Sequence, residues 1–372
     1  MPPSTSSVDR EGAGQPAPGA PRREPGRSPH IRVLLKSGFS SERIGDSDLA
    51  SEVRVSFSGG RVQLLDSQGR VLENGSGFRL RPDPGRVLGF AGASYRGVMD
   101  VFVNPVGQPV IVNELDLEDY LKGVISNEIS LYQQSREAVS AMTIAARSFA
   151  FSSLGQNAVR GFDVYSDTRS QVYGGVSSEA ALSSQVVDET WGEVVAYGNK
   201  AIVAFYSSTC GGTTASYRET FQRDGLPYLE GGASCPDSAS PYSSWDEQID
   251  ISRIQPLLDR MVGVGRLKKL EILDKGQWGR TVSMRFVGSR GDKVLRGLDI
   301  RSALGLKSNW ITDFKLLLDG SGYVEGIRVK GRGWGHGLGL CQHGTMELAR
   351  RGWTAERILQ HYYLETEIVK FW

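Results

Sequence analysis

The sequence is poor in the residues that most often hold metals or form disulfides. It has three cysteines and four histidines among 372 residues. Three cysteines exclude a disulfide-rich scaffold, because they allow at most one bridge and one free thiol. The sequence contains no CxxC pair and no two histidines four residues apart, so the usual zinc-binding spacings are missing. We therefore expect no metal and no cofactor. A metal site would need ligands brought together by folding, drawn from Cys210, Cys235, His336, Cys341 and His343.

Long apolar runs and an excess of one charge are also missing. No apolar run reaches the length of about 18 residues that a membrane-spanning helix requires. Lys and Arg total 43 against 42 for Asp and Glu, which gives a formal net charge of +1. A protein that binds nucleic acid by neutralising phosphates needs a broad basic excess, so we expect no nucleic-acid partner.

The first 30 residues lack the apolar side chains of a folded segment. They hold seven of the fifteen prolines and a single branched apolar residue, Val8. Because such a segment cannot bury enough surface to offset its ordering entropy, we expect residues 1–30 to be disordered. An export signal would need a continuous apolar stretch, which these residues do not contain.

The remaining sequence has an ordinary globular composition, with 39% hydrophobic residues. Short apolar runs separated by Gly, Asn and Pro predict a β-rich region over residues 31–112. Helical spacing follows at residues 117–129, 137–152 and 177–191, and again at 345–351 and 354–362. Strand-like runs lie at residues 193–197, 201–206, 281–286 and 323–329. We predict an α+β fold, with a mixed α/β catalytic core over residues 113–372 and a smaller lobe inserted at 251–330 around a cleft.

Three polar segments with flanking glycines are candidate ligand-binding loops. Residues 206–214 (YSSTCGGTT) follow an apolar run and would offer hydroxyls and backbone N–H groups to a ligand. Residues 331–344 (GRGWGHGLGLCQHG) combine glycines with aromatic and polar side chains suited to recognising a sugar or a nucleobase. Residues 163–175 end in QVYGG. The alternatives are a self-capping Ser/Thr turn, a flexible linker and a loop before a helix, respectively.

One carboxylate has a position suited to acid–base chemistry. Glu128 comes at the end of the helix predicted at 117–129, beside apolar residues. Burial among those neighbours would favour its protonated form, which is the form that a general acid for glycosidic bond cleavage needs. The alternative is a solvated glutamate at a helix end. A nucleophilic Cys341 or Cys210 with a histidine base is a further alternative that sequence separation cannot test.

Six motifs in order resemble those of the SpoIID/LytB family of peptidoglycan proteins, and together they cover about residues 113–372. They are LEDYLKGVISNE at 117–128, EAV at 137–139 with AARSFA at 145–150, QVYGG at 171–175, AFYSSTCGG at 204–212, GWGHGLGLCQHG at 333–344 and ILQHYY at 358–363.

The resemblance implies a lytic transglycosylase that cuts MurNAc–GlcNAc bonds of peptidoglycan and leaves a 1,6-anhydro sugar. It places the general acid/base at Glu128 and implies substrate-binding residues, which we take to be Arg147, Gln171, Tyr173, Ser207, Ser208, Trp334, His336 and Gln342. Its expected partners are peptidoglycan glycan strands and, in an alternative function as a non-catalytic enhancer, a cell-wall amidase. It also implies an extracytoplasmic location, although no export signal or membrane anchor is visible in the sequence.

The sequence departs from the family pattern at two places. Some members bind zinc through a His-Cys pair just before QVYGG, where this chain has Arg169 and Ser170. Cys341 and His343 stand where a serine and an aromatic residue are usual. For an exported protein with three cysteines, Cys210–Cys235 is the first pair that we expect to form a disulfide.

Overall fold

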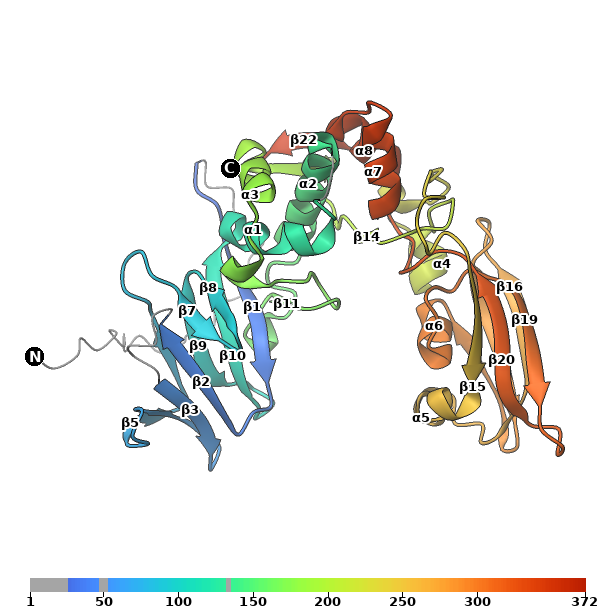
Figure 1. Ribbon diagram of the computed structural model, residues 1–372, viewed down its shortest axis with the longest axis horizontal. Helices are drawn as coiled ribbons and strands as arrows, with labels where there is room; N and C mark the ends of the chain where they lie inside the picture. The colour runs from blue at the N-terminus through green and yellow to red at the C-terminus, as the bar shows by residue number, and fades with distance from the viewer. Residues whose placement is uncertain (1–25, 47–52, 132–134) are drawn as a thin grey trace, which may run out of the picture. The chain divides into compact units, whose positions relative to one another are not determined.

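The computed structural model describes residues 26–46, 53–131 and 135–372. Most of the segment expected to be disordered, residues 1–25, lies outside this range. The chain divides into two compact units (Figure 1). Unit 1 takes in the chain up to Ala196 together with Lys200–Val203 and Ile368–Trp372, and unit 2 consists of Tyr197–Asn199 and Ala204–Glu367. The expected domain limits at residues 30, 112, 250 and 330 stay a prediction.

Two antiparallel sheets form the β-rich part of unit 1. The five-stranded sheet has the order β11-β1-β10-β9-β6, in which only the β11–β1 pairing is parallel, and the six-stranded sheet has the order β5-β4-β3-β2-β7-β8. The strands are β1 (His30–Ser37), β2 (Ser41–Asp46), β3 (Val53–Ser58), β4 (Arg61–Leu65), β5 (Val71–Gly75), β6 (Gly77–Leu80), β7 (Leu88–Phe90), β8 (Ala93–Tyr95), β9 (Val98–Val103), β10 (Pro109–Asp116) and β11 (Val164–Tyr165). In β4 the buried residues alternate with the others, as a strand with one face on a core requires.

Unit 1 also contains three helices and a short three-stranded sheet. The helices are α1 (Leu117–Glu128), α2 (Arg136–Ser152) and α3 (Ala181–Glu189). The sheet has the order β13 (Lys200–Ala201), β12 (Glu193–Tyr197), β22 (Glu367–Lys370). Asp116 caps α1 by accepting a hydrogen bond from the Glu118 N–H, as its position at the helix start predicts. The first two predicted helices are confirmed to within a residue, whereas the helix predicted at 177–191 is wrong at both ends. Its first residues form the 3₁₀ turn Gly175–Ser178 instead.

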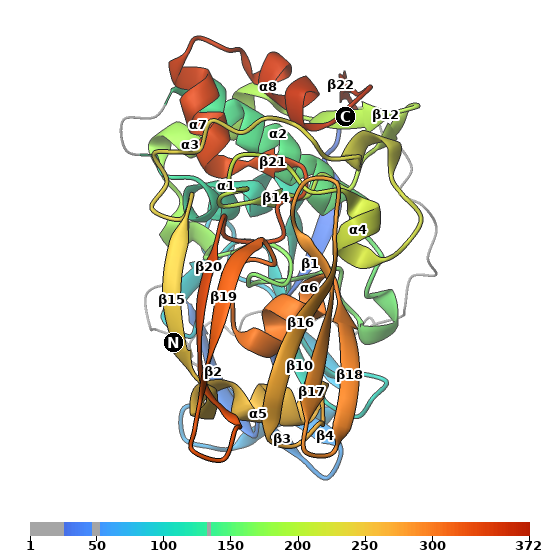
Figure 2. The ribbon, with the colours of Figure 1, turned by 90° about the vertical axis from the view of Figure 1, so that its right-hand side faces the viewer.

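In unit 2, two three-stranded antiparallel sheets pack with two helices around one hydrophobic core (Figure 2). The sheets have the orders β15-β20-β19 and β16-β17-β18. The elements are β15 (Trp245–Asp250), α5 (Ile251–Met261), β16 (Leu267–Lys275), β17 (Thr281–Gly288), β18 (Gly291–Arg296), α6 (Leu298–Leu304), β19 (Ile311–Leu318) and β20 (Val324–Gly331). This part of the chain covers the lobe expected at residues 251–330.

The rest of unit 2 surrounds a short parallel pair, β14 (Tyr206–Ser207) with β21 (Leu340–Cys341). It also contains α4 (Tyr217–Phe221), a 3₁₀ turn at Pro227–Leu229, α7 (Gln342–Arg350) and α8 (Ala355–Tyr362). The strand predicted over 201–206 is wrong in its middle, because only its two ends form strands. The α+β fold class is confirmed. None of the helices in the described part of the chain combines the length and hydrophobicity needed to cross a bilayer.

Candidate functional site

In unit 1, Glu128 is the last residue of α1 and its side chain is partly exposed. The helix ends there because Ile129 adopts an extended conformation, at φ −138° and ψ 137°. The backbone N–H of Val172 donates a hydrogen bond of 2.7 Å to Glu128 Oε1. Val172 belongs to the QVYGG motif, so the structure brings the first and third sequence motifs together. This contact orients a carboxylate that still has access to solvent.

A buried layer of hydrogen bonds lies behind this carboxylate. Tyr120 is completely buried on α1, and its hydroxyl donates to Gln171 Oε1 at 3.0 Å. Gln171 in turn donates from Nε2 to the carbonyl of Ala146 on α2. Burial, and next the charge of Glu128, raises the pKa of Tyr120 well above its usual value. The phenol therefore stays protonated and fixes the orientation of the Gln171 amide.

The glycines of α1 and QVYGG permit the close approach of the two segments. A Cβ on Gly123 would lie 2.8 Å from the Tyr173 ring and 2.9 Å from the Gly175 carbonyl oxygen. The backbone N–H of Gly174 donates to the Gly123 carbonyl at 3.0 Å. Tyr173 packs against Tyr120, with ring centroids 5.0 Å apart, and its hydroxyl donates to Asn113 Oδ1. These contacts hold Val172 in position to donate to Glu128.

Arg147 does not lie where the sequence analysis placed it. Its side chain has no exposed surface and forms an ion pair with Glu118, Nη2 to Oε2 at 2.8 Å. It also donates to Thr190 Oγ1 and to the carbonyls of Val187 and Glu193. A guanidinium engaged in this way offers no surface to a sugar and supports the packing of α2, so a substrate contact by Arg147 stays a prediction that the burial does not favour. Gln171 and Tyr173, exposed by 0% and 5%, likewise act behind the surface.

In unit 2, the fourth and fifth motifs lie side by side. Strand β14 pairs with β21 in parallel, Ser207 opposite Cys341. Beyond the strands, Thr209 and Trp334 exchange two backbone hydrogen bonds, at 3.2 and 2.8 Å. The buried Ser207 hydroxyl has no hydrogen-bond partner within the described residues. Gly335 packs so closely on it that a Cβ there would lie 2.7 Å from Ser207 Cβ.

The side chains of these two motifs differ in accessibility. Ser208 is partly exposed on the loop after β14, and Gln342 is partly exposed as the first residue of α7. Trp334 is 40% exposed, and its ring lies 4.2 Å, centroid to centroid, from that of Tyr242. Tyr242 was missed by the sequence analysis, because nothing in its SPYSSW context distinguishes it from an ordinary loop residue. An exposed aromatic pair of this kind is a suitable surface for the apolar face of a sugar.

His336 is held neutral. The backbone N–H of Leu338 donates to His336 Nδ1 at 2.9 Å, so Nδ1 is the unprotonated nitrogen. Burial, followed by the charges of Arg301 and Arg280, lowers the pKa of His336 to about 3. Its ring also packs edge-on against Phe205. At neutral pH this imidazole carries no charge, its Nδ1 accepts from Leu338, and its Nε2–H is the one donor of the ring.

The cysteines do not have the properties of a nucleophile. Cys210 and Cys235 form the expected disulfide. Burial raises the pKa of the free Cys341 thiol to about 12, so the thiol is protonated at neutral pH. The Cys341 side chain accepts hydrogen bonds from the N–H groups of Cys210 and Gly344, both at 3.3 Å. A Cys341 nucleophile is therefore disfavoured, and a Cys210 nucleophile would require reduction first.

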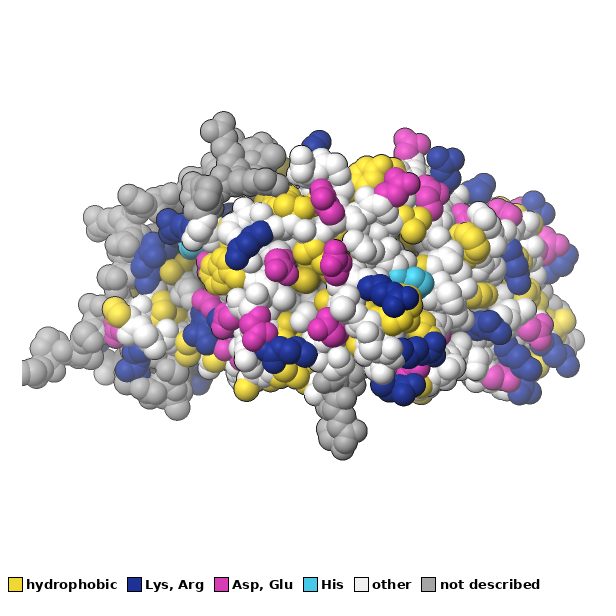
Figure 3. Space-filling view, turned by 90° about the horizontal axis from the view of Figure 1, so that it is seen from above, with side chains coloured by type: hydrophobic (Ala, Val, Ile, Leu, Met, Phe, Trp, Pro, Cys, Tyr) yellow, Lys and Arg dark blue, Asp and Glu magenta, His cyan; other side chains and the backbone are white. Residues whose placement is uncertain are grey.

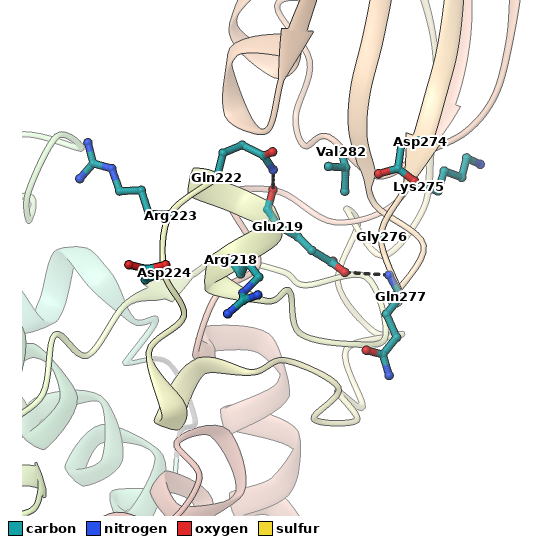
Figure 4. Close-up of a pocket in the computed structure, with 10 residues that line it drawn as sticks. All are labelled: Arg218, Glu219, Gln222, Arg223, Asp224, Asp274, Lys275, Gly276, Gln277 and Val282. Carbon is teal, nitrogen blue, oxygen red and sulfur yellow. Dashed lines mark hydrogen bonds between the residues drawn. The ribbon is translucent and has the colours of Figure 1, made fainter.

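A separate polar pocket of about 560 Å³ lies in unit 2, between the segment around α4 and the β16–β17 turn (Figure 4). Glu219 bridges its two sides, since its carboxylate accepts from the Gln277 N–H at 2.9 Å. Its lining residues are Arg218, Glu219, Gln222, Arg223, Asp224, Asp274, Lys275, Gly276, Gln277 and Val282. They include none of the site residues that the sequence motifs predict.

Comparison with known proteins bears on these motifs. Residues 107–197 match the family model of SpoIID, the stage II sporulation protein. The chain carries a SpoIID domain. It contains Glu128, Arg147, Gln171 and Tyr173, and the resemblance drawn from the motifs is thereby confirmed. Residues 217–339 match a domain of unknown function (DUF8618), which includes Trp334 and His336. Ser207, Ser208 and Gln342 lie outside both matches.

Relatives of this SpoIID-domain chain extend over most of its length. Stage II sporulation protein D of Bacillus subtilis is 29% identical over 73% of the chain and 82% of the relative. An uncharacterized protein of Brachyspira hyodysenteriae is 28% identical over 82% of the chain and 77% of the relative. The amidase enhancer of Bacillus subtilis is 28% identical over 90% of the chain, which corresponds to 55% of that longer protein.

Proposed function

We propose that this chain cleaves the glycan strands of peptidoglycan by lytic transglycosylation, with Glu128 as its general acid/base. A role connected with the cell wall is supported by the SpoIID domain and by the stage II sporulation protein D and amidase enhancer relatives. The observation that carries the finer proposal is the geometry of Glu128. This carboxylate is partly exposed at a helix end and oriented by the Val172 N–H, whereas the side chains behind it are buried and engaged with one another.

The proposed reaction uses this one carboxyl group twice. Protonated Glu128 donates its proton to the glycosidic oxygen of a MurNAc–GlcNAc bond, and that bond breaks. The C6 hydroxyl of MurNAc attacks the anomeric carbon, and the Glu128 carboxylate accepts the hydroxyl proton. The product carries a 1,6-anhydro ring and no water is consumed. Ordinary glycosidases need two carboxylates because a water molecule must be activated or an enzyme ester formed, and neither step occurs here.

The other predicted residues divide by burial into two groups. Gln171 and Tyr173 hold the QVYGG backbone that orients Glu128, and Arg147 holds α1 against α2. In unit 2, Trp334, Ser208 and Gln342 offer accessible side chains, and Ser207 offers a buried hydroxyl with no partner within the described residues. We propose that these residues bind sugar hydroxyls and ring faces, with neutral His336 as a further hydrogen-bonding group.

The charge pattern suits a glycan rather than a polyanion. On the face drawn in Figure 3, Lys and Arg side chains of the described residues are interspersed with Asp and Glu side chains. A neutral sugar chain is recognised by hydrogen bonds and aromatic faces, which require no basic surface. Because peptidoglycan lies outside the cytoplasm, the proposed function places the protein there as well.

The test is digestion of purified glycan strands from which the stem peptides have been removed. We expect the wild-type protein to release fragments that are one water lighter than hydrolysis products, as mass spectrometry resolves. Glu128→Gln should release none. Glu189→Gln, which changes an exposed glutamate of α3 in the same unit, is the matched control and should behave as wild type. Release of non-anhydro ends, or undiminished cleavage by Glu128→Gln, would refute the proposed mechanism.

An enhancer function is the second candidate, and the amidase enhancer relative favours it. In that case the chain binds glycan strands, leaves them intact and increases the activity of a separate cell-wall amidase. Wild type and Glu128→Gln would then bind glycan equally and stimulate the amidase equally. The digestion above therefore separates the two functions with the same pair of proteins.

A further inference from the structure

All three cysteines of the sequence lie at one place in unit 2. They come from separate segments: Cys210 follows β14, Cys235 lies in a loop 25 residues later and Cys341 ends β21. Their three sulfur atoms lie within 4.8 Å of one another, and all three residues are buried. Sulfur ligands of one tetrahedral zinc ion lie about 3.8 Å apart, given Zn–S bonds of about 2.3 Å. Opening the Cys210–Cys235 bridge would therefore give three thiols whose sulfur atoms need to move only slightly to reach the separation found around one zinc ion.

A fourth ligand lies beside them. Asp237 is buried, exposed by 2%, and its Oδ2 atom lies 3.6 Å from Cys341 Sγ. A sulfur and an oxygen bound to the same tetrahedral zinc lie about 3.5 Å apart. The Gly211 N–H donates to the same oxygen at 2.7 Å, and this contact holds the carboxylate toward the sulfurs.

Two features of the surroundings would support sulfur ligands once a metal ion is bound. Cys341 Sγ accepts two backbone N–H groups, an arrangement that supports ligands around metal–thiolate centres. Arg280 is also buried, and it donates from Nη2 to the Cys210 carbonyl at 2.7 Å. Its Nε and Nη1 atoms have no hydrogen-bond partner within the described residues. A buried guanidinium with free donors offsets part of the negative charge that three thiolates and a carboxylate retain after binding Zn²⁺.

We propose that the chain binds one Zn²⁺ through Cys210, Cys235, Cys341 and Asp237 when the Cys210–Cys235 bridge is reduced. A dithiol reductant supplies two electrons, which convert the bridge to two thiols and the reductant to its cyclic disulfide. Zn²⁺ then displaces three thiol protons and forms a closed, four-coordinate site. The disulfide and the zinc site are thus alternative states of the same residues. The motif spacing could not reveal the site, because its ligands lie up to 131 residues apart.

The site would be structural. It joins the loop after β14, the loop around Cys235 and the end of β21, which continues into α7. These are the segments that carry Ser207, Ser208 and Gln342. The inference itself does not depend on the proposed glycan chemistry, because its measurements are metal content and spectra.

The experiment uses the untagged full-length chain, purified in the presence of a dithiol reductant without oxygen. We expect one zinc per chain by elemental mass spectrometry, and protection of three thiols from a thiol reagent until a chelator is added. Cys341→Ser and Asp237→Asn should reduce bound zinc sharply. Asp246→Asn, which changes an exposed aspartate on β15, is the control for the second variant and should keep the metal.

Substitution with Co²⁺ keeps the test decisive if a variant does not fold. The reduced wild-type chain should give the ligand-field and thiolate charge-transfer bands of a tetrahedral Co²⁺–thiolate centre, and the oxidised chain should not. A reduced chain with three reactive thiols and no bound metal would overturn the proposal. Equal metal binding by the oxidised chain, or by folded Cys341→Ser, would overturn it too.

Discussion

Removal of the charge at Glu118 is expected to destabilise unit 1 strongly, because this residue balances the buried Arg147. Glu118 is exposed by 1% and accepts from Arg147 Nε and Nη2, from the Gly192 N–H and from Trp372 Nε1. In Glu118→Gln the new amide would direct N–H groups toward these donors and leave a buried guanidinium without its counter-charge. Breaking a buried pair in this way costs about 3–5 kcal/mol.

Native-state hydrogen exchange read at peptides from α1 and α2 measures this loss in unit 1 alone. Amide exchange that requires the unit to open should become faster by roughly two to three and a half powers of ten. This follows because about 1.4 kcal/mol corresponds to a factor of ten in the opening equilibrium. The matched control is Glu189→Gln, which removes an exposed partner of Arg136. Screening by solvent makes such surface pairs weak, so its exchange should change little.

The paired replacement Glu118→Leu with Arg147→Met sharpens the test. Apolar side chains of similar size remove both charges together, so much of the lost stability should return. If Glu118→Gln exchanges no faster than Glu189→Gln, the assignment of Arg147 to a structural role is wrong. A substrate-binding Arg147 would instead give Arg147→Met with normal exchange at α1 and weaker binding of glycan.

Three further predictions concern pH, packing and binding. The pKa of His336 is lowered to about 3 in the folded chain, so between about pH 6.5 and 3 only the unfolded chain binds a proton at this residue. The free energy of unfolding should therefore be unaffected by this group above the ordinary pKa of about 6.5 and should fall as pH drops toward 3, by at most ~1.4 kcal/mol per pH unit. His336→Gln should reduce this pH dependence in denaturant titrations. Gly123→Ala should cost roughly 1–3 kcal/mol of stability by urea unfolding, because its Cβ would overlap Tyr173, and a neutral result would contradict the packing. Trp334→Ala should weaken glycan binding roughly tenfold in calorimetry with little loss of stability, whereas Leu318→Ala, which changes another exposed apolar side chain of unit 2, should leave binding unchanged.

Local signals in the sequence were sufficient for much of the fold. The apolar spacing over residues 117–129 predicted α1 to within a residue, and the Gly, Asn and Pro residues between short apolar runs predicted the β-rich region that contains β4. The run at 201–206 misled because its apolar residues are buried without pairing along their length as a strand. A short run of apolar residues is expected both for a segment buried by tertiary packing and for a strand paired in a sheet. The sequence pattern alone therefore cannot distinguish the two.

The sequence named candidate site residues but could not show how deeply each one is buried. Order along the chain brought Glu128 and QVYGG into one hypothesis, and the hydrogen bond to Val172 agrees with it. Exposure is a property of the packed protein, so the family resemblance could place Arg147 among the substrate-binding residues although its side chain is fully buried. The sequence offered the three cysteines as possible ligands but could not show that they meet, because spacing along the chain predicts a metal site only when its ligands are neighbours in sequence.

Two glutamates of helix α1 have different surroundings, and the difference supports the proposed role of Glu128. Glu118 lies in the first turn of α1, is 1% exposed and pairs with Arg147 Nη2 at 2.8 Å. A carboxylate enclosed by its partners in this way offers no surface to a substrate. Glu128 lies at the opposite end, where the dipole opposes charge while the Val172 N–H favours it, and solvent reaches its side chain. A group that must both give and accept a proton needs such opposing influences, and this supports the proposal that Glu128 performs the acid–base step.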